Sequence, residues 1–345
     1  MTAVSRNLIF WEPVVSPHKL GLFAALAAAN DVASVRQIAD RPLGKDRLAL
    51  GWKAAVPPFL PTVVSPSAGQ IEEIVRNSPI DAIHIFSGIH WVPTIVRGMA
   101  AAIRLKRRFG IMSEPRAFEC LGGVGRLVHS WMSERKVRAN CDFVLAIGRH
   151  GPPWFRLAGY APQRIYPFAY FVGKRQDPAR RSTSAQIRIG YIGRLTKAKG
   201  FAIAVEAVRT LRQPVEFEIA GTGPLASLAE KYAAKNPQRV TFRGTLPMAQ
   251  VHDFLAAIDI LLVPSMTKDD GWGVVVGEAL QAGAAVVASG RVGASVCICN
   301  DRMGIVVERP SPGSVAEAIA AVIDRGILRM EDRAYRSAWA AAHIS

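Results

Sequence analysis

Short apolar segments alternate with longer segments of helical periodicity along almost the whole chain. This alternation is typical of parallel sheets whose two faces are covered by helices. In the first half, the apolar segments predict strands at 8–11, 33–38, 80–86, 110–113 and 143–147, and the periodic segments predict helices at 20–29, 93–107 and 124–138. We therefore expect one doubly wound α/β domain over residues 1–172.

A second series of the same kind follows. It predicts strands at 187–192, 215–219, 240–242, 258–263, 285–288 and 304–307, and helices at 201–211, 225–234, 248–257, 274–282 and 314–323. Between the two series, residues 173–186 have no large apolar side chain and are rich in charge, so we place the linker there. The second domain is then 187–328, and two similar α/β domains facing a cleft are the simplest arrangement.

The last segment, 329–345, has Met330, Ala334, Ala338 and Trp339 at approximately helical spacing. A tryptophan is too apolar for a free end of the chain. We expect this segment to form a helix that packs back on the first domain.

Composition agrees with two domains and indicates an anionic partner. The chain has 345 residues, of which 50% are hydrophobic, and a formal net charge of +16. A length of this order suits two domains, and the positive charge favours a phosphorylated ligand, an acidic membrane surface or nucleic acid. The four cysteines lack zinc-site spacing, and no signal peptide or membrane-spanning run is recognisable. We therefore expect a cytoplasmic protein.

The first candidate chemistry lies in the glycine-bounded segment 193–200, directly after a predicted strand. In parallel sheets, ligands bind beyond the carboxyl ends of the strands. Gly193 begins this segment, and Arg194 and Lys199 supply two cations suited to a diphosphate. The alternative is a solvated basic loop.

A second glycine-rich turn, Gly221-Thr222-Gly223-Pro224, follows the next predicted strand. Gly221 and Gly223 let the backbone approach a ligand closely before Pro224 starts a helix. The alternative is an ordinary tight turn, because the third glycine and the acidic residue of a dinucleotide fingerprint are missing.

The segment 270–278 places two carboxylates on either side of a glycine-rich helix start. It reads Asp270-Gly271-Trp272-Gly273 and continues through an apolar run to Glu278. Glycines leave amides exposed at the helix start, and a carboxylate inside the helix needs hydroxyl donors such as those of a ribose. The alternative is that Asp270 caps the helix and Glu278 pairs within the protein.

These segments recur in an order and spacing that resemble the family-4 retaining glycosyltransferases (glycosyl transferases group 1), which have two Rossmann-like domains in the GT-B arrangement. The resemblance covers 187–323 closely and the first half only in outline. It implies that Arg194 and Lys199 bind the donor diphosphate and Glu278 the ribose. It also implies that Asp270 holds hydroxyls of the transferred sugar, with backbone contacts from Gly271, Trp272 and Gly273.

Two positions depart from the family pattern. The first acidic position is usually Glu and here is Asp270, one methylene shorter, so neighbouring Asp269 is an alternative. In the first domain the family often has a histidine where this chain has Ser113-Glu114-Pro115. We therefore take Glu114 as a candidate group facing the acceptor, with a plain surface or capping carboxylate as the alternative.

His18 is a further candidate, because it follows the first predicted strand and imidazole exchanges protons near neutral pH. A structural histidine is the alternative.

The stretch 97–138 is strongly basic, with ten cations against three acids, and apolar residues are interleaved. Such a surface suits anionic lipid headgroups, and it predicts a peripheral location at the inner face of the plasma membrane. A merely solvated face and nucleic acid are the alternatives, but no nucleic-acid fold signature supports the latter.

The function predicted from these observations is retaining transfer of a sugar from a nucleotide-diphosphate sugar to a glycolipid or a growing saccharide. We expect a metal-independent reaction without a cofactor, and no nucleic-acid partner. Two alternatives are a nucleotide-sugar epimerase on the same architecture and a non-catalytic basic membrane adaptor.

Overall fold

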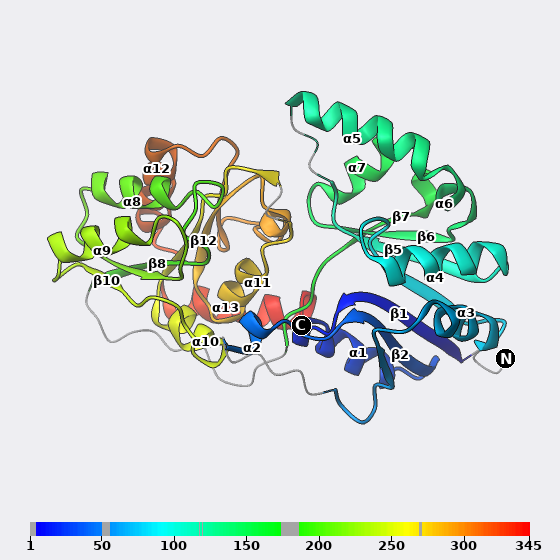
Figure 1. Ribbon diagram of the computed structural model, residues 1–345. Helices are drawn as coiled ribbons and strands as arrows, with labels where there is room; N and C mark the ends of the chain where they lie inside the picture. Colours follow the sequence, from blue (N-terminus) through cyan, green and yellow to red (C-terminus); the bar gives the residue numbers. More distant parts are fainter. Residues whose placement is uncertain (1–4, 50–55, 117, 119, 174–185, 269–270) are drawn as a thin grey trace. The chain divides into compact units, whose positions relative to one another are not determined.

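The computed structural model describes residues 5–49, 56–116, 118, 120–173, 186–268 and 271–345. The chain forms two compact units, Met1–Gly173 and Lys174–Ser345. Each unit has a parallel β-sheet with helices packed on it (Figure 1). Of the expected linker 173–186, residues 174–185 lie outside the described part of the chain.

The first unit contains a seven-stranded sheet in the order β3-β2-β1-β4-β5-β6-β7. All neighbouring strands are parallel. The order reverses direction between β1 and β4, which is the kind of switch point where α/β sheets bind ligands. The strands are β1 (Arg6–Val14), β2 (Val32–Arg41), β3 (Thr62–Val64), β4 (Ile83–Ser87), β5 (Arg108–Ser113), β6 (Phe143–Ile147) and β7 (Ile165–Phe168).

Aromatic packing holds the helices of this unit on the sheet. Trp11 of β1 is fully buried and stacks on Phe86 of β4 at 5.4 Å between ring centroids. Gly98 lets α4 approach closely, because a Cβ there would lie 2.9 Å from the Trp11 ring. The helices are η1 (Pro17–Lys19), α1 (Leu20–Ala27), α2 (Lys45–Ala49), α3 (Ala68–Asn77), α4 (Pro93–Arg104), α5 (Cys120–Ser133), α6 (Arg135–Asn140), α7 (Gly151–Leu157) and η2 (Pro162–Arg164).

The second unit contains a six-stranded sheet in the order β10-β9-β8-β11-β12-β13, again with parallel neighbours. Its central strands are buried on both faces, which explains why they are continuous apolar runs in the sequence. All residues of β11 and β12 are buried. The strands are β8 (Ile187–Ile192), β9 (Val215–Ala220), β10 (Val240–Phe242), β11 (Ile260–Val263), β12 (Ala285–Ser289) and β13 (Gly304–Val307).

Two groups of helices pack in this second unit: α8 lies against α12, and α11 lies against α10 and α13 (Figure 1). The elements are α8 (Phe201–Thr210), α9 (Ala226–Lys235), α10 (Met248–Ala257), α11 (Val274–Gln281), η4 (Gly293–Cys297), α12 (Pro312–Asp324) and α13 (Met330–His343). Among the described residues, no helix combines the length and apolar character needed to cross a bilayer.

Helix α13 forms where the sequence predicts it, and its packing on the first domain stays a prediction. Within the second unit, two of its buried arginines bind neighbouring helices. Arg333 donates hydrogen bonds to the carbonyl oxygens of Ala256 and Ile258 at 2.7 and 2.8 Å. Arg336 donates to the carbonyl oxygen of Gly283 at 2.9 Å. The helix therefore caps the carboxyl ends of α10 and α11, where positive charge is favourable.

The single helix predicted over 124–138 is two helices, α5 and α6. They are separated at Glu134, whose side chain is only 1% exposed. Its carboxylate turns inward and accepts a hydrogen bond from Tyr160 at 2.8 Å, so this position belongs to the interior and not to an exposed helical face. Strands β3 and β7, and helices α2, α3 and α7, were not predicted.

Candidate functional site

Three loops meet at the carboxyl edge of the second sheet. Residues 193–200 follow β8, 221–224 follow β9, and the loop from Pro264 follows β11. These strands are neighbours in the order β9-β8-β11, and the sheet reverses its strand order between β8 and β11. Loops at such a reversal form the usual ligand site of a doubly wound sheet. The donor-site residues predicted from the sequence therefore share one edge.

The loop after β8 has a firmly held backbone. The hydroxyl of buried Tyr191 donates to the carbonyl oxygens of Arg194 at 3.0 Å and Lys199 at 3.4 Å. Burial raises the pKa of Tyr191, so the hydroxyl keeps the proton that it donates. The amide of Lys199 also donates to Thr196 Oγ at 3.2 Å. The backbone that carries the two predicted diphosphate ligands is thus fixed at both positions.

The loop after β9 packs on the first loop backbone to backbone. Gly221 has a φ of 134°, and a Cβ there would lie 1.8 Å from the carbonyl oxygen of Gly193. A Cβ at Gly223 would lie 2.7 Å from the carbonyl oxygen of Leu195. The amide of Leu195 donates to the carbonyl oxygen of Thr222 at 2.9 Å. Both glycines are therefore needed for the contact between loops, whatever they contribute to a ligand.

The loop after β11 leads into α11 through two glycines in the left-handed region. Gly271 has a φ of 67°, and Gly273, the N-cap of α11, has a φ of 77°. The carbonyl oxygens of Gly271 and Trp272 accept hydrogen bonds from Gly293 at 2.9 Å and Ala294 at 2.7 Å. The Trp272 ring is buried, so only its backbone is available near a ligand. A helix N-terminus is left facing this edge, and it favours negative charge.

Of the two predicted carboxylates, Glu278 lies in α11 and is partly buried. It lies five residues after the N-cap Gly273, more than one turn into the helix. Asp270, and the alternative Asp269, lie outside the described residues.

The first-unit candidates, His18 and Glu114, lie near a polar cluster at the carboxyl edge of their own sheet. Glu12 is the last buried residue of β1, with a side chain that is 2% exposed, and its carboxylate pairs with Lys19 at 2.6 Å. Ser87, the last residue of β4, donates to Glu12 at 2.8 Å and accepts from Lys19 at 2.9 Å. The cluster therefore joins β1, η1 and β4 at the switch point of the first sheet. His18 lies beside Lys19 in η1, and burial, together with the charge of Arg47, lowers its pKa.

Glu114 joins this cluster through Tyr170. Burial is the largest cause of the raised pKa of Tyr170, and the charges of Glu114 and Glu12 and a hydrogen bond to Glu114 add to it. Lys19 lies 5.6 Å from the centroid of the same ring. Glu114 is half-buried and hydrogen-bonded to Tyr170, which differs from the alternative of a plain surface carboxylate.

Sequence reasoning missed several of these residues. Glu12 and Ser87 directly follow the strands predicted at 8–11 and 80–86, so the rule that selected His18 and Glu114 also applies to them. Tyr191 and Tyr170 act through contacts that no local pattern reveals.

The second unit resembles known proteins in sequence. Residues 186–325 match the family described as glycosyl transferases group 1. A 2-deoxystreptamine glucosyltransferase from Streptomyces kanamyceticus is 35% identical over 136 residues, 37% of this chain and 33% of the relative. A GDP-mannose-dependent alpha-(1-6)-phosphatidylinositol monomannoside mannosyltransferase from Mycobacterium tuberculosis is 30% identical over 169 residues, 44% of each chain. The predicted resemblance to group 1 glycosyltransferases is confirmed over this region, and the chain spans less than half the length of these relatives.

The fold of the whole chain also has a known counterpart. The structure of Anabaena Alr3699/HepE in complex with UDP superposes with a TM-score of 0.70 at 15% identity, covering 98% of this chain and 96% of that one. The predicted fold class, two Rossmann-like α/β domains of the GT-B type, is confirmed.

Proposed function

We propose that this chain is a retaining glycosyltransferase that moves a sugar from a nucleotide-diphosphate sugar to a glycolipid or a growing saccharide. One observation carries the proposal: the loops bearing Arg194, Lys199 and Gly271–Gly273 converge at the switch point of the second sheet, beside the helix that contains Glu278. Cations, helix amides and a carboxylate at one sheet edge match the groups of a sugar nucleotide.

The reaction requires that a diphosphate leave from the sugar. Arg194 and Lys199 would neutralise the developing charge on that diphosphate, and amides at the start of α11 would add to this. We propose front-face attack by the acceptor hydroxyl without an enzyme nucleophile, with the leaving diphosphate assisting deprotonation. Because two protein cations balance the diphosphate, we propose that the transfer is metal-independent.

The remaining donor contacts follow from position in the second unit. Glu278 would accept hydrogen bonds from the ribose hydroxyls. Asp270, or Asp269, would bind hydroxyls of the transferred sugar, with backbone contacts from Gly271, Trp272 and Gly273. The HepE structures are described as complexes with UDP and with UDP-glucose, and the mycobacterial relative is named as GDP-mannose-dependent. We therefore propose a uridine or guanosine diphosphosugar as donor.

The acceptor would bind the first unit. Glu114 and His18 would face it, beside the cluster of Glu12, Lys19 and Ser87, which offers both donors and acceptors for sugar hydroxyls. The mycobacterial relative is named for a phosphatidylinositol mannoside, a glycolipid. Together with the basic stretch 97–138, this supports a glycolipid or saccharide acceptor handled by a cytoplasmic enzyme at the inner face of the plasma membrane.

The decisive experiment measures donor binding by thermal shift with a panel of uridine and guanosine diphosphosugars. One of them is expected to raise the melting temperature, because a ligand that binds only the folded state stabilises it. Arg194→Ala and Lys199→Ala should each weaken binding about tenfold, since each removes a charged hydrogen bond to phosphate. Lys197→Ala is the matched control, because Lys197 is an exposed lysine of the same loop outside the assigned contacts.

Transfer is then followed with the donor that binds. EDTA should leave the rate unchanged, and the product should keep the anomeric configuration of the donor. If no diphosphosugar binds, or if both variants bind as tightly as Lys197→Ala, the assigned phosphate site is wrong. Release of an epimerised donor without acceptor would favour an epimerase.

A further inference from the structure

Helix α5 presents apolar side chains to solvent and polar groups to the interior. Val124, Val128 and Met132 are 60%, 52% and 77% exposed, and their spacing of four residues places them along one face. On the inward side, Ser130 is fully buried, and Glu134, which directly follows the helix, is almost so. A helix packed only for burial has the opposite pattern, so the outward apolar face requires an explanation.

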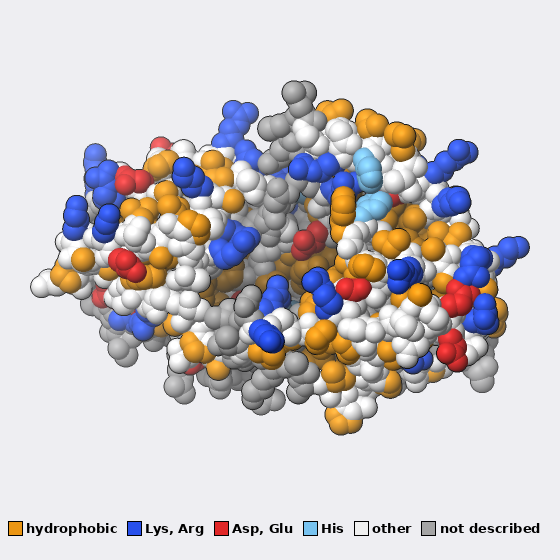
Figure 2. Space-filling model, in the orientation of Figure 1, with side chains coloured by type: hydrophobic (Ala, Val, Ile, Leu, Met, Phe, Trp, Pro, Cys, Tyr) orange, Lys and Arg blue, Asp and Glu red, His pale blue; other side chains and the backbone are white. Residues whose placement is uncertain are grey.

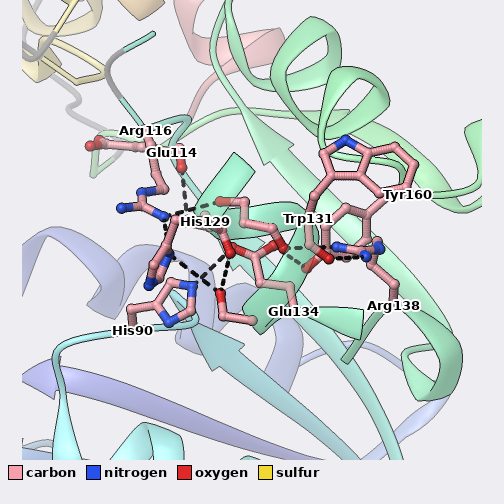
Figure 3. Close-up of polar contacts among 11 residues, drawn as sticks. His90, Glu114, Arg116, His129, Trp131, Glu134, Arg138 and Tyr160 are labelled. Carbon is pink, nitrogen blue, oxygen red and sulfur yellow. Dashed lines mark hydrogen bonds and ion pairs between the residues drawn. The ribbon is translucent and has the colours of Figure 1, made fainter. Parts of the chain in front are cut away.

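A polar network holds α5 in this orientation, with Glu134 at its centre (Figure 3). Burial alone would raise the pKa of Glu134, but hydrogen bonds from His90, Tyr160 and Ser130 outweigh it and lower the pKa. His90 Nε2 lies 2.9 Å from the carboxylate, and Arg116 donates to Ser130 Oγ at 3.0 Å. Rotating the helix to bury its valines would break these contacts, so the apolar face stays outward.

More apolar side chains continue this surface. Trp131 is 52% exposed, and its indole N–H donates to the carbonyl oxygen of Leu157, itself an exposed leucine, at 2.8 Å. Trp91 is 83% exposed, and His90 beside it has its ring 5.3 Å from that of His129 in α5. We call this surface the α5 face, and it consists of Trp91, Val124, Val128, Trp131, Met132 and Leu157. Figure 2 shows exposed apolar side chains over α5 with Lys and Arg side chains nearby.

The charge around the α5 face has one dominant sign. Between residues 121 and 160 the sequence has six cations and two acids. One acid, Glu134, is buried in the network, and the other, Asp142, pairs with Arg108 at 3.0 Å. Neither acid offsets the cations, which are Arg126, Arg135, Lys136, Arg138, Arg149 and Arg156.

We propose that the α5 face docks on the surface of an anionic phospholipid bilayer. Apolar side chains, among them two tryptophans, would enter the boundary between headgroups and acyl chains, and the cations would contact lipid phosphates. Tryptophan suits this boundary because its ring is apolar and its N–H is polar. The inference deepens the proposed place of the enzyme at a membrane and identifies the surface that makes the contact.

The test is co-sedimentation of the purified chain with phosphatidylcholine vesicles, with and without phosphatidylglycerol. The wild type should partition onto the anionic vesicles, and binding should weaken in high salt. The double variant Val128→Asp/Met132→Asp should lower the partition coefficient at least about tenfold, because it places two carboxylates at the bilayer boundary. Ile80→Asp is the matched control, because Ile80 is an apolar residue of the same unit, outside the α5 face, and is as exposed as Met132 (77%).

All substituted side chains are exposed, so the variants should melt like the wild type. The proposal would be overturned if the double variant bound anionic vesicles as well as Ile80→Asp does. It would also be overturned if the wild type bound both kinds of vesicle equally well, or bound neither kind. If the wild type did not bind vesicles but formed a concentration-dependent dimer that the double variant abolishes, the α5 face would instead be assigned to contact with a second copy of the chain. Donor binding by the double variant, measured without vesicles, should be unchanged, which separates this inference from the proposed transfer reaction.

Discussion

Trp91 has a backbone conformation that L side chains rarely adopt, with a φ of 72°. Such a conformation costs about 1–2 kcal/mol for a residue with a Cβ and little for glycine. Since the Trp91 ring is largely exposed, its packing contacts offset little of this conformational free energy. Backbone strain that packing does not repay is more common at functional positions, and Trp91 belongs to the α5 face.

The strain at Trp91 can be measured by comparing two truncations. Trp91→Gly should be more stable than Trp91→Ala by about 1 kcal/mol, because both remove the ring and only glycine relieves the left-handed conformation. Urea unfolding of the two variants gives this difference. Equal stability of the alanine and glycine variants would show that the backbone is not strained.

His84 is a buried histidine whose two ring nitrogens both have hydrogen-bond partners inside the protein. Its Nδ1 accepts a hydrogen bond from the Trp11 indole at 3.1 Å, so its proton lies on Nε2, which faces Ser78 Oγ at 3.2 Å. A second proton on Nδ1 would face the indole N–H. Burial, and secondarily the charge of Arg107, lowers the pKa of His84 from 6.5 to about 4.

A pH dependence of stability follows. As the pH falls below 6.5, His84 binds a proton in the unfolded chain, whereas in the folded chain it binds one only near pH 4. His84 should therefore reduce the free energy of unfolding by roughly 3 kcal/mol as the pH falls across this window. His84→Gln, which can keep both hydrogen bonds, should show a shallower fall than the wild type in urea unfolding from pH 7 to pH 4. Parallel curves would contradict the assignment.

At the scale of elements, α13 and α11 act as a connected pair. Arg336 is fully buried, and it donates to the carbonyl oxygens of Gly283 at 2.9 Å and Ile327 at 2.9 Å. Burial, with the charge of Arg333 adding to it, lowers its pKa to about 10, and it remains charged at neutral pH. One long side chain thus completes the end of α11 and fixes α13 on it.

Removing the Arg336 side chain should destabilise the folded protein. Arg336→Met keeps much of the apolar stem but leaves buried carbonyl oxygens without their donor, so we expect a loss of about 3 kcal/mol in the free energy of unfolding. Arg329→Met is the control, because Arg329 is 75% exposed and such a substitution changes stability by less than about 0.5 kcal/mol. Similar unfolding midpoints for the two variants would argue against a structural function of Arg336.

At the scale of the whole molecule, the sequence predicts the second unit better than the first. Strands at 240–242 and 304–307 form at the predicted residues, because each is a short apolar run between turn residues. In the first unit, β3 has only three residues, all at least partly exposed, so it gives no periodic signal. The break at Glu134 depends on His90 and Tyr160, which are distant in the sequence.

The candidate site likewise has one part that the sequence predicts and another that it does not. Glycines and charges directly after strands predict the donor loops, since chain direction alone brings strand ends together in a parallel sheet. The pairing of Lys19 with Ser87 spans 68 residues, and Tyr191 supports its loop from inside the core. Such contacts depend on side-chain direction in the folded chain, which no local pattern encodes.

The anchoring of α11 at its far end has a consequence for variation in this protein. The helix begins directly after the predicted sugar contacts and ends at Gln281. The carbonyl oxygens of the next two residues, Ala282 and Gly283, accept hydrogen bonds from Arg333 and Arg336. Any shift of α13 would therefore tilt or loosen the helix that carries Glu278. If the proposed sugar transfer is correct, a screen for altered transfer should recover substitutions in α13, outside the predicted donor contacts.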